Sequence, residues 1–187
     1  MTILLRTARL ILRRFAEADA ANLFALHADP EVIRHTSAWF EGGGRLVDFD
    51  TVVRRTLPGF LARYERDGAF AFWAADDLQS GVFQGWFQFT PAATPGEVEL
   101  GYRLRKAVWG QGLATEGARA LVEHGFAHWG VTRVVASALL ANPASIRVME
   151  KAGLRRSREF RHDPGGPAVT YALDRAVFKA ARRTGAT

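Results

Sequence analysis

The 187-residue sequence contains no cysteine. The absence of this residue excludes disulfide bonds and metal sites built on thiolates. It also excludes every reaction that proceeds through a cysteine nucleophile. Chemistry in this chain must therefore rely on carboxylates, hydroxyls, imidazoles, amides and the backbone.

The sequence also lacks long apolar runs, and none approaches the roughly 18 consecutive apolar residues of a membrane span. The first six residues, Met1 to Arg6, are too short for a secretory leader. We therefore expect a cytoplasmic protein without a membrane partner. Hydrophobic residues make up 48% of the chain, enough for the core of a single domain spanning residues 1–187.

Lysine is scarce, because 22 of the 25 basic residues are arginine. The net charge is +6 and the pI is about 10.4. Such a balance favours an anionic partner such as nucleic acid, a ribosome or a phosphorylated cofactor, or it reflects a GC-rich genome that encodes Arg in place of Lys. No basic run exceeds two residues and no nucleic-acid motif occurs, so we expect no direct nucleic-acid binding.

The spacing of apolar residues predicts one mixed α/β domain with the order β-α-α-β-β-β-α-β-α-β-β. A proline at position 58 is expected to kink the second helix. The first strand is expected around residues 10–15. The other predicted strands are 70–74, 82–89, 97–104, 133–138, 155–161 and 168–173, and the predicted helices are 19–29, 48–66, 112–129 and 143–152.

A glycine-containing segment, Trp109 to Glu116, joins a predicted strand to the longest predicted helix. Two glycines at such a junction let the backbone approach a ligand, and the helix N-terminus favours a phosphate or pyrophosphate. No Lys follows the glycines, which excludes a P-loop. Thr115 stands where a dinucleotide fold needs Gly or Ala. The structural alternative is a glycine turn that permits tight packing of helix on strand.

A second motif, residues 142–154, follows thirty residues later. Both motifs, the pair Gly101-Tyr102 and the opening segment 7–32 together resemble the GCN5-related N-acetyltransferases (GNAT), in particular their RimJ/RimL-like branch. The resemblance implies a GNAT (acyl-CoA N-acyltransferase) fold, α/β, with a mixed, mostly antiparallel sheet, splayed central strands and flanking helices. The family's loop pattern begins with Arg or Gln, and its replacement here by Trp109 is usual in that branch.

The resemblance implies acetyl-CoA as co-substrate. Backbone N–H groups of the glycine loop would hold the pyrophosphate, and the strand 97–104 would bind the pantetheine arm. The residues expected to bind the cofactor are Leu100, Tyr102, Trp109, Gly110, Gln111, Gly112, Leu113, Ala114, Thr115, Asn142 and Ser145. Asn142 is also suited to cap the helix that Pro143 begins.

Glu97 and Glu99 share one face of their strand, because side chains alternate with a period of two. In the resembling family this strand supplies the general base, and Glu99 is the first candidate and Glu97 the second. The alternative is that both are solvated surface glutamates. A carboxylate base suits a protein α-amine, whose pKa near 8 leaves an appreciable neutral fraction at pH 7.

Many acetyltransferases carry a tyrosine that protonates the leaving thiolate, at the position that Met149 occupies here. Methionine cannot donate a proton. Ser145 resembles the serine that members of the branch use near the CoA sulfur, so it is the candidate proton donor. The alternative is that Ser145 is only a first-turn helix residue.

The resemblance implies acetyl transfer to a primary amine by direct attack, with a protein N-terminus as the favoured acceptor. A small amine (an antibiotic, a polyamine or an amino acid) and a non-catalytic, acyl-CoA-binding regulatory domain remain as alternatives, and a homodimer is left open. We expect the acceptor to enter between a loop around residues 37–45 and the turn 163–167. Trp39, Phe40 and Tyr171 are the candidate substrate-binding residues, and the pair His124 and His128 lacks an obvious third metal ligand.

Overall fold

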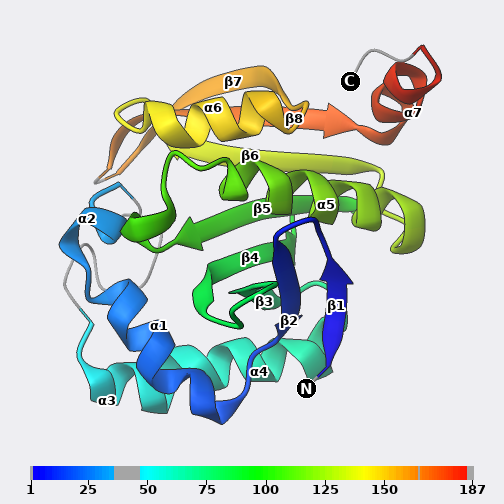
Figure 1. Ribbon diagram of the computed structural model, residues 1–187. Helices are drawn as coiled ribbons and strands as arrows, with labels where there is room; N and C mark the ends of the chain where they lie inside the picture. Colours follow the sequence, from blue (N-terminus) through cyan, green and yellow to red (C-terminus); the bar gives the residue numbers. More distant parts are fainter. Residues whose placement is uncertain (1, 36–46, 164, 185–187) are drawn as a thin grey trace.

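A single sheet of eight strands organises the chain, as the computed structural model of residues 2–35, 47–163 and 165–184 shows (Figure 1). The strands lie in the order β1-β2-β3-β4-β5-β6-β8-β7. Their bounds are β1 Ile3–Arg6, β2 Leu10–Arg14, β3 Phe72–Asp77, β4 Phe83–Pro91, β5 Glu97–Leu104, β6 Arg133–Leu139, β7 Arg155–His162 and β8 Gly166–Asp174.

Helices cover both faces of this sheet. Within the described ranges no helix is both long and apolar enough to cross a membrane. The helices and helical turns are η1 Glu17–Asp19, α1 Ala20–His27, α2 Pro30–Ile33, α3 Phe49–Thr51, the π-helical η3 Val52–Thr56, α4 Leu57–Arg66, η4 Lys106–Val108, α5 Leu113–His128, α6 Pro143–Lys151 and α7 Arg175–Arg183.

Alternation along β4 divides the core into two clusters. Phe87 and Phe89 point to the face that α5 covers, whereas Phe83 and Trp86 pack with apolar side chains of α1, η3 and α4. The sheet is therefore a middle layer between α5 on one side and the α1/α4 helices on the other. Residues of neighbouring strands that share a face can meet on one side of this layer.

Helix α5 lies unusually close to β4 because two of its residues lack side chains. A Cβ atom at Gly117 would lie 2.2 Å from the Phe87 ring, and one at Gly125 would lie 2.6 Å from the Phe89 ring. Both rings fill the space that the glycines leave. This close contact fixes the helix and, with it, the loop at its N-terminus.

Among the strand pairings of the described residues, only β5 and β6 run parallel, and their pairing is short. It covers only Glu97 to Glu99 of β5 and Arg133 to Val135 of β6. On its other edge each of these strands has a longer antiparallel partner. β5 pairs with β4 over seven residue pairs, and β6 pairs with β8 over seven residue pairs. The sheet therefore separates beyond Glu99 into two halves, which is the splay that the resemblance implies.

A buried ion-pair network fixes the entry to α1. The Arg13 guanidinium of β2 donates two hydrogen bonds to the Asp19 carboxylate, at 2.7 and 2.8 Å, and its Nε donates to Asp76 of β3 at 2.5 Å. Burial alone would raise the pKa of Asp19, but the Arg13 guanidinium and the Ala16 N–H lower it below its usual value. Asp19 ends η1, so the network ties α1 to the sheet.

The predicted fold class and most predicted elements are confirmed, with β5 at its predicted bounds. The sequence interpretation missed β1, the short α2 and α7, and the expected kink at Pro58 takes another form. Because Pro58 cannot donate a backbone hydrogen bond, the helix widens just before it, and the Leu57 N–H donates to Val52 O across a π-turn.

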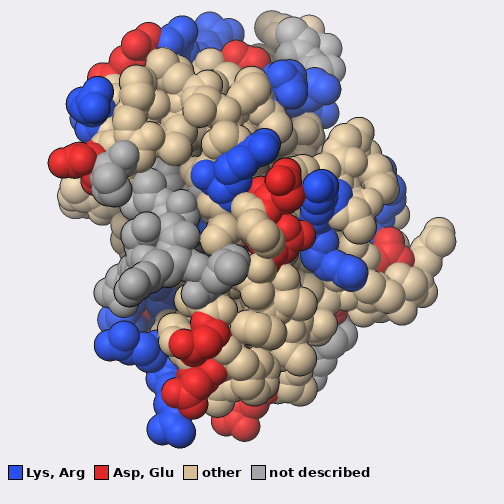
Figure 2. Space-filling model, turned by 90° about the vertical axis from the view of Figure 1, so that its left-hand side faces the viewer, with Lys and Arg blue, Asp and Glu red and all other residues tan. Residues whose placement is uncertain are grey.

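On the face of the molecule seen in Figure 2, basic and acidic side chains are interspersed rather than gathered into one patch of either sign. A mixed surface of this kind gives no extended electrostatic footprint for nucleic acid on that face.

Candidate functional site

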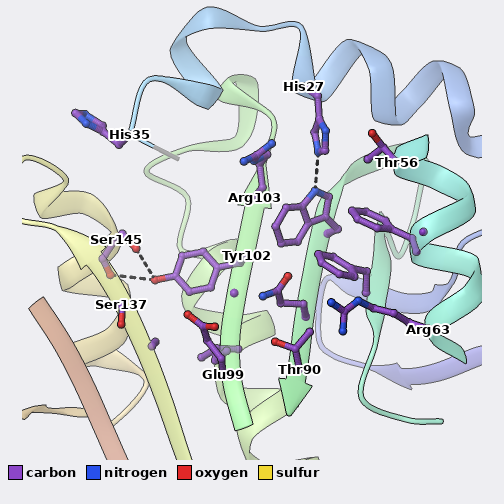
Figure 3. Close-up of a pocket in the computed structure, with 18 of the residues that line it drawn as sticks. His27, His35, Thr56, Arg63, Thr90, Glu99, Tyr102, Arg103, Ser137 and Ser145 are labelled. Carbon is purple, nitrogen blue, oxygen red and sulfur yellow. Dashed lines mark hydrogen bonds between the residues drawn. The ribbon is translucent and has the colours of Figure 1, made fainter. Parts of the chain in front are cut away.

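A cavity of about 920 Å³ begins where β5 and β6 separate and extends to the α1/α4 side of the sheet (Figure 3). Its lining comes from β4, β5, β6, α1, η3, α4 and α6, so distant parts of the sequence meet in it. On the strand side it includes Thr90, Glu99, Tyr102, Ser137, Asn142, Ser145 and Met149.

Glu99 projects to the α1/α4 side of the sheet. It stands opposite Thr90 of β4, and the next pair on the same face is Gln88 opposite Gly101. A Cβ atom at Gly101 would lie 2.9 Å from Gln88 Cδ, so the glycine makes room for the Gln88 side chain beside Glu99. Burial raises the pKa of Glu99 above its usual value. A carboxylate in this setting holds a proton more readily than one in water, which suits a general base.

Glu97, the second candidate base, does not line the cavity. Its Oε2 lies 3.2 Å from Arg133 Nε in a salt bridge, and Arg133 also contacts Asp174. The two glutamates share a strand face but differ in surroundings, because Glu97 begins the pairing with β6 beside Arg133, whereas Glu99 ends it at the edge of the cavity.

The opposite side of the cavity presents two hydroxyls. Tyr102 Oη lies 3.0 Å from Ser145 Oγ and also donates to the Ser145 carbonyl oxygen at 3.0 Å. Asn142 Oδ1 accepts a hydrogen bond from the Ser145 N–H, so Asn142 caps α6 as predicted. Burial raises the pKa of Tyr102 to about 12, which keeps its hydroxyl protonated at neutral pH.

The sequence interpretation assigned Tyr102 only a backbone contact with the cofactor and missed its hydroxyl. The position of Tyr102 is explained by the splay. It follows Glu99 by three residues, so its side chain leaves the other face of β5, beyond the last residue pair with β6, and reaches α6. Met149, the residue in place of the family's tyrosine, also lines the cavity. A hydroxyl from β5 thus lies near the position where α6 lacks one.

The glycine loop lies at the N-terminus of α5. Gly112 is the N-cap residue with φ of 81°, and Gly110 has φ of 76°, a left-handed backbone that favours glycine. The first N–H groups of a helix have no partner within it, so those near Leu113 to Thr115 are available to an anion. Trp109 Nε1 donates to Leu104 O at 2.9 Å and anchors the loop to the end of β5.

A contact that no motif predicted holds this loop from the other side. Arg9 Nη1 donates to Gln111 O at 2.9 Å, and Arg9 Nε donates to Glu116 at 2.7 Å. Thr7 Oγ1 donates to the same carboxylate at 2.5 Å. The segment before β2 therefore fixes both the loop and the first turn of α5.

The far wall of the cavity lies on the α1/α4 side. His27 Nε2 accepts a hydrogen bond from Trp86 Nε1 at 3.1 Å, and burial with the nearby Arg103 charge lowers the pKa of His27 to about 3. His27 is therefore neutral at physiological pH. Arg103 lies over the Trp86 ring at 5.4 Å, and burial lowers its pKa to about 10, which leaves it charged.

The three predicted substrate-binding residues do not appear among the described lining residues of the cavity. Trp39 and Phe40 lie outside the described residues. Tyr171 is buried, donates to Glu150 Oε1 at 2.9 Å and does not line the cavity. The described residues of the turn 163–167 do not line it either. Tyr171 thus packs against α6, away from the described lining of the cavity.

A family model described as "Acetyltransferase (GNAT) domain" matches residues 9–155. Among curated proteins, the chain is 31% identical over 158 residues to the uncharacterized protein YkkB of Bacillus subtilis, covering 83% of this chain and 87% of that protein. It is 28% identical to an aminoglycoside N(6')-acetyltransferase type 1 of Serratia marcescens, covering 92% of this chain and 86% of that protein.

Two solved structures share the fold. A GNAT-family acetyltransferase from Bacillus anthracis superposes with a TM-score of 0.79 at 21% identity, covering 94% of this chain and 99% of the other. RimL, a ribosomal L7/L12 α-N-protein acetyltransferase in complex with coenzyme A, superposes with a TM-score of 0.75 at 19% identity, covering 92% and 97%. The separated strands and the loop at α5 in this chain fit a coenzyme A arm and pyrophosphate.

The loop assignment predicts that Gly112→Val abolishes coenzyme A binding. A branched side chain would crowd the pyrophosphate and would not tolerate the φ of 81°. Gly130→Val is the matched control, because Gly130 has φ of 67°, has no atom within 4 Å of its Cβ position, and lies beyond the other end of α5.

Both variants should lose some stability, but only Gly112→Val should lose the rise in melting temperature with added coenzyme A. A ligand at about 100 times its Kd stabilises the native state by about 2.7 kcal/mol, which a thermal melt resolves. Undiminished affinity in a folded Gly112→Val protein would show that the pyrophosphate lies elsewhere.

Proposed function

This chain belongs to the GNAT acetyltransferase family and is an acetyl-CoA-dependent N-acetyltransferase, and we propose that its acceptor is the α-amine of a protein N-terminus. One observation carries this proposal. The cavity does not stop at Glu99 but continues along the α1/α4 side to residues of η3 and α4, including Thr56 and Arg63 (Figure 3). That space beyond the transfer position suits a chain that continues behind its amine.

Glu99 is the proposed general base. It lies on the α1/α4 side, from which the acceptor approaches, and the raised pKa that burial causes suits proton abstraction from an amine. An α-amine with a pKa near 8 requires less assistance than a lysine side chain near 10.4. The salt bridge of Glu97 with Arg133 makes Glu97 the weaker candidate.

Ser145 and Tyr102 are the proposed hydrogen-bond donors to the leaving sulfur. Tyr102 leaves the face of β5 opposite to that of Glu99, and base and donors line the same cavity where β5 and β6 separate. Beyond Glu99 the β6-facing edge of β5 has no strand partner, so its backbone groups can bind the pantetheine arm and the thioester oxygen. In this proposal the amine attacks the thioester directly in a ternary complex, and the absence of cysteine excludes an acyl-enzyme on that residue.

A small-molecule amine is the second candidate acceptor, because one relative is named as an aminoglycoside N(6')-acetyltransferase. Incubation of the protein with acetyl-CoA and either short peptides or small amines separates the candidates by release of free thiol. We expect turnover with peptides that carry a free N-terminus and none with the same peptides blocked at that terminus. Turnover confined to aminoglycosides or polyamines would replace the proposed acceptor, and no turnover with any amine would favour a regulatory acyl-CoA-binding domain.

Glu99→Gln should lower kcat about 100-fold or more, with little change in the KM for acetyl-CoA, because it removes a proton acceptor and no cofactor contact. Glu97→Gln is the control and should retain near-normal kcat.

The pH profile provides a further test of Glu99 as the base. A base acts only when deprotonated, so kcat/KM should fall as the pH decreases through the raised Glu99 pKa, above the ordinary 4.5. Loss of this acidic limb of the pH profile in Glu99→Gln supports Glu99 as the general base. A larger decrease in kcat in Glu97→Gln would assign the role of base to Glu97 instead.

Removal of either hydroxyl should also lower kcat. We expect Ser145→Ala and Tyr102→Phe each to lose about tenfold in kcat, because a donor to a charged sulfur is worth about 1.5–3 kcal/mol. The double variant should lose little more than the more impaired single variant, since the two hydroxyls share one hydrogen bond. Unchanged kcat in both single variants would mean that the thiolate leaves without help from these residues.

A further inference from the structure

The acceptor side of the cavity carries an excess of positive charge. Six described lining residues are charged: the acids Asp48 and Glu99, and the arginines Arg55, Arg63, Arg66 and Arg103. Asp48 is engaged as the cap of α3, where its Oδ1 accepts from the Thr51 N–H. Glu99 is the proposed base. The remaining charge of the wall is positive and is concentrated on η3 and α4.

Arg63 is the best-placed of these arginines. Its guanidinium lies 5.5 Å from the centre of the Phe72 ring, and its Nη1 lies 3.2 Å from Asp67 Oδ2. Asp67 also pairs with Arg66 at 2.8 Å, so one carboxylate serves two guanidinium groups. The net charge of this trio is +1. Figure 3 shows the Arg63 side chain reaching from α4 towards Thr90 and Glu99.

The strand register gives the scale of the site. Glu99 of β5 stands opposite Thr90 of β4, and Gln88, two residues before Thr90 on the same face, stands opposite Phe72 of β3. Glu99 and Phe72, whose ring carries Arg63, are thus two strands and two residues apart, or about 12 Å. About three to four extended residues of a peptide span the same distance.

The amide of Gln88 lies between these two ends. Its Oε1 is buried and has no hydrogen-bond partner among the described residues. A buried acceptor without a partner destabilises the protein until a donor reaches it. The ammonium or an amide N–H of an acceptor is such a donor.

We propose that the acceptor is an anionic amine, a primary amine that carries a carboxylate or phosphate about 12 Å away, with the amine at Glu99 and Gln88 and the anion at Arg63 and its neighbours. This inference rests on the proposed acetyl transfer at Glu99 and specifies its substrate. For a peptide it places an acidic side chain at about the third residue. Polycationic amines meet like charge on this wall.

The test compares peptide twins that differ in one charge. Amidated peptides that begin Ala-Ala-Glu, Ala-Ala-Gln and Ala-Ala-Lys have a similar backbone and no terminal carboxylate. 8-Aminooctanoate, whose extended chain separates amine and carboxylate by a similar distance, and its amide provide the same comparison for small molecules, and an aminoglycoside provides the cationic extreme. The measurement is kcat/KM by thiol release, at low and high salt, because screening weakens a partly exposed charge pair.

We expect the acidic peptide to exceed its amide twin about ten- to a hundredfold in kcat/KM, the value of one charged hydrogen bond. Arg63→Gln should bring the twins near parity by lowering kcat/KM for the acidic peptide far more than for the amide twin, and Arg63→Lys should restore part of the preference. Arg66→Gln is the second variant if Arg63→Gln does not fold. Arg54→Gln is the control, because Arg54 pairs with Asp50 at 2.6 Å, is exposed and does not line the cavity.

Equal rates for the twins in the unaltered protein, or a preference that survives both Arg63→Gln and Arg66→Gln, would overturn the inference. So would a faster rate with the lysine peptide or the aminoglycoside. If no peptide reacts but 8-aminooctanoate exceeds its amide, the inference stands and only the protein N-terminus as acceptor fails.

Discussion

The short pairing of β5 with β6 is the constraint on which the site depends. Three residue pairs hold the two halves of the sheet together, and each strand then follows its antiparallel partner. If the pairing continued, the backbone of β5 would be satisfied by β6 and the cavity between them would close. Because the pairing ends at Glu99, a cavity opens beside β5. The side chains of Glu99 and Tyr102 leave opposite faces of the strand, and both line this cavity.

The elements around this gap are held by contacts that leave little freedom. The glycines of α5 allow the helix to lie against Phe87 and Phe89, which fixes the loop at its N-terminus. Arg9 binds the same loop from the chain before β2. On the other side of the sheet, the buried Arg13 network ties α1 to β2 and β3. Cofactor and acceptor sides are therefore fixed by different contacts to one sheet, which allows the acceptor wall to differ among proteins that keep the same cofactor loop.

Much of the site followed from local sequence. The alternation in residues 97–104 predicted the strand and the shared face of Glu97 and Glu99. The Asn-Pro pair predicted the cap of α6, and the glycines predicted the turn before α5. Such features depend on residues close in sequence, so periodicity and turn chemistry suffice to find them. The same local logic missed α7, whose residues contribute no buried side chain, and β1, which is short and only partly buried.

The sequence by itself determined the family, the α/β order, the anion-binding loop and the absence of any cysteine chemistry. Only the tertiary structure distinguished Glu99 from Glu97, since they differ in the side chains around them and not in their strand. Only the tertiary structure brings the Tyr102 hydroxyl to Ser145, which lies 43 residues later in the chain. It also places Arg63 of α4 over Phe72 of β3, two strands away from Glu99 of β5. These relations arise where strands separate and helices cross the sheet, and packing between distant segments decides them because no local periodicity encodes it.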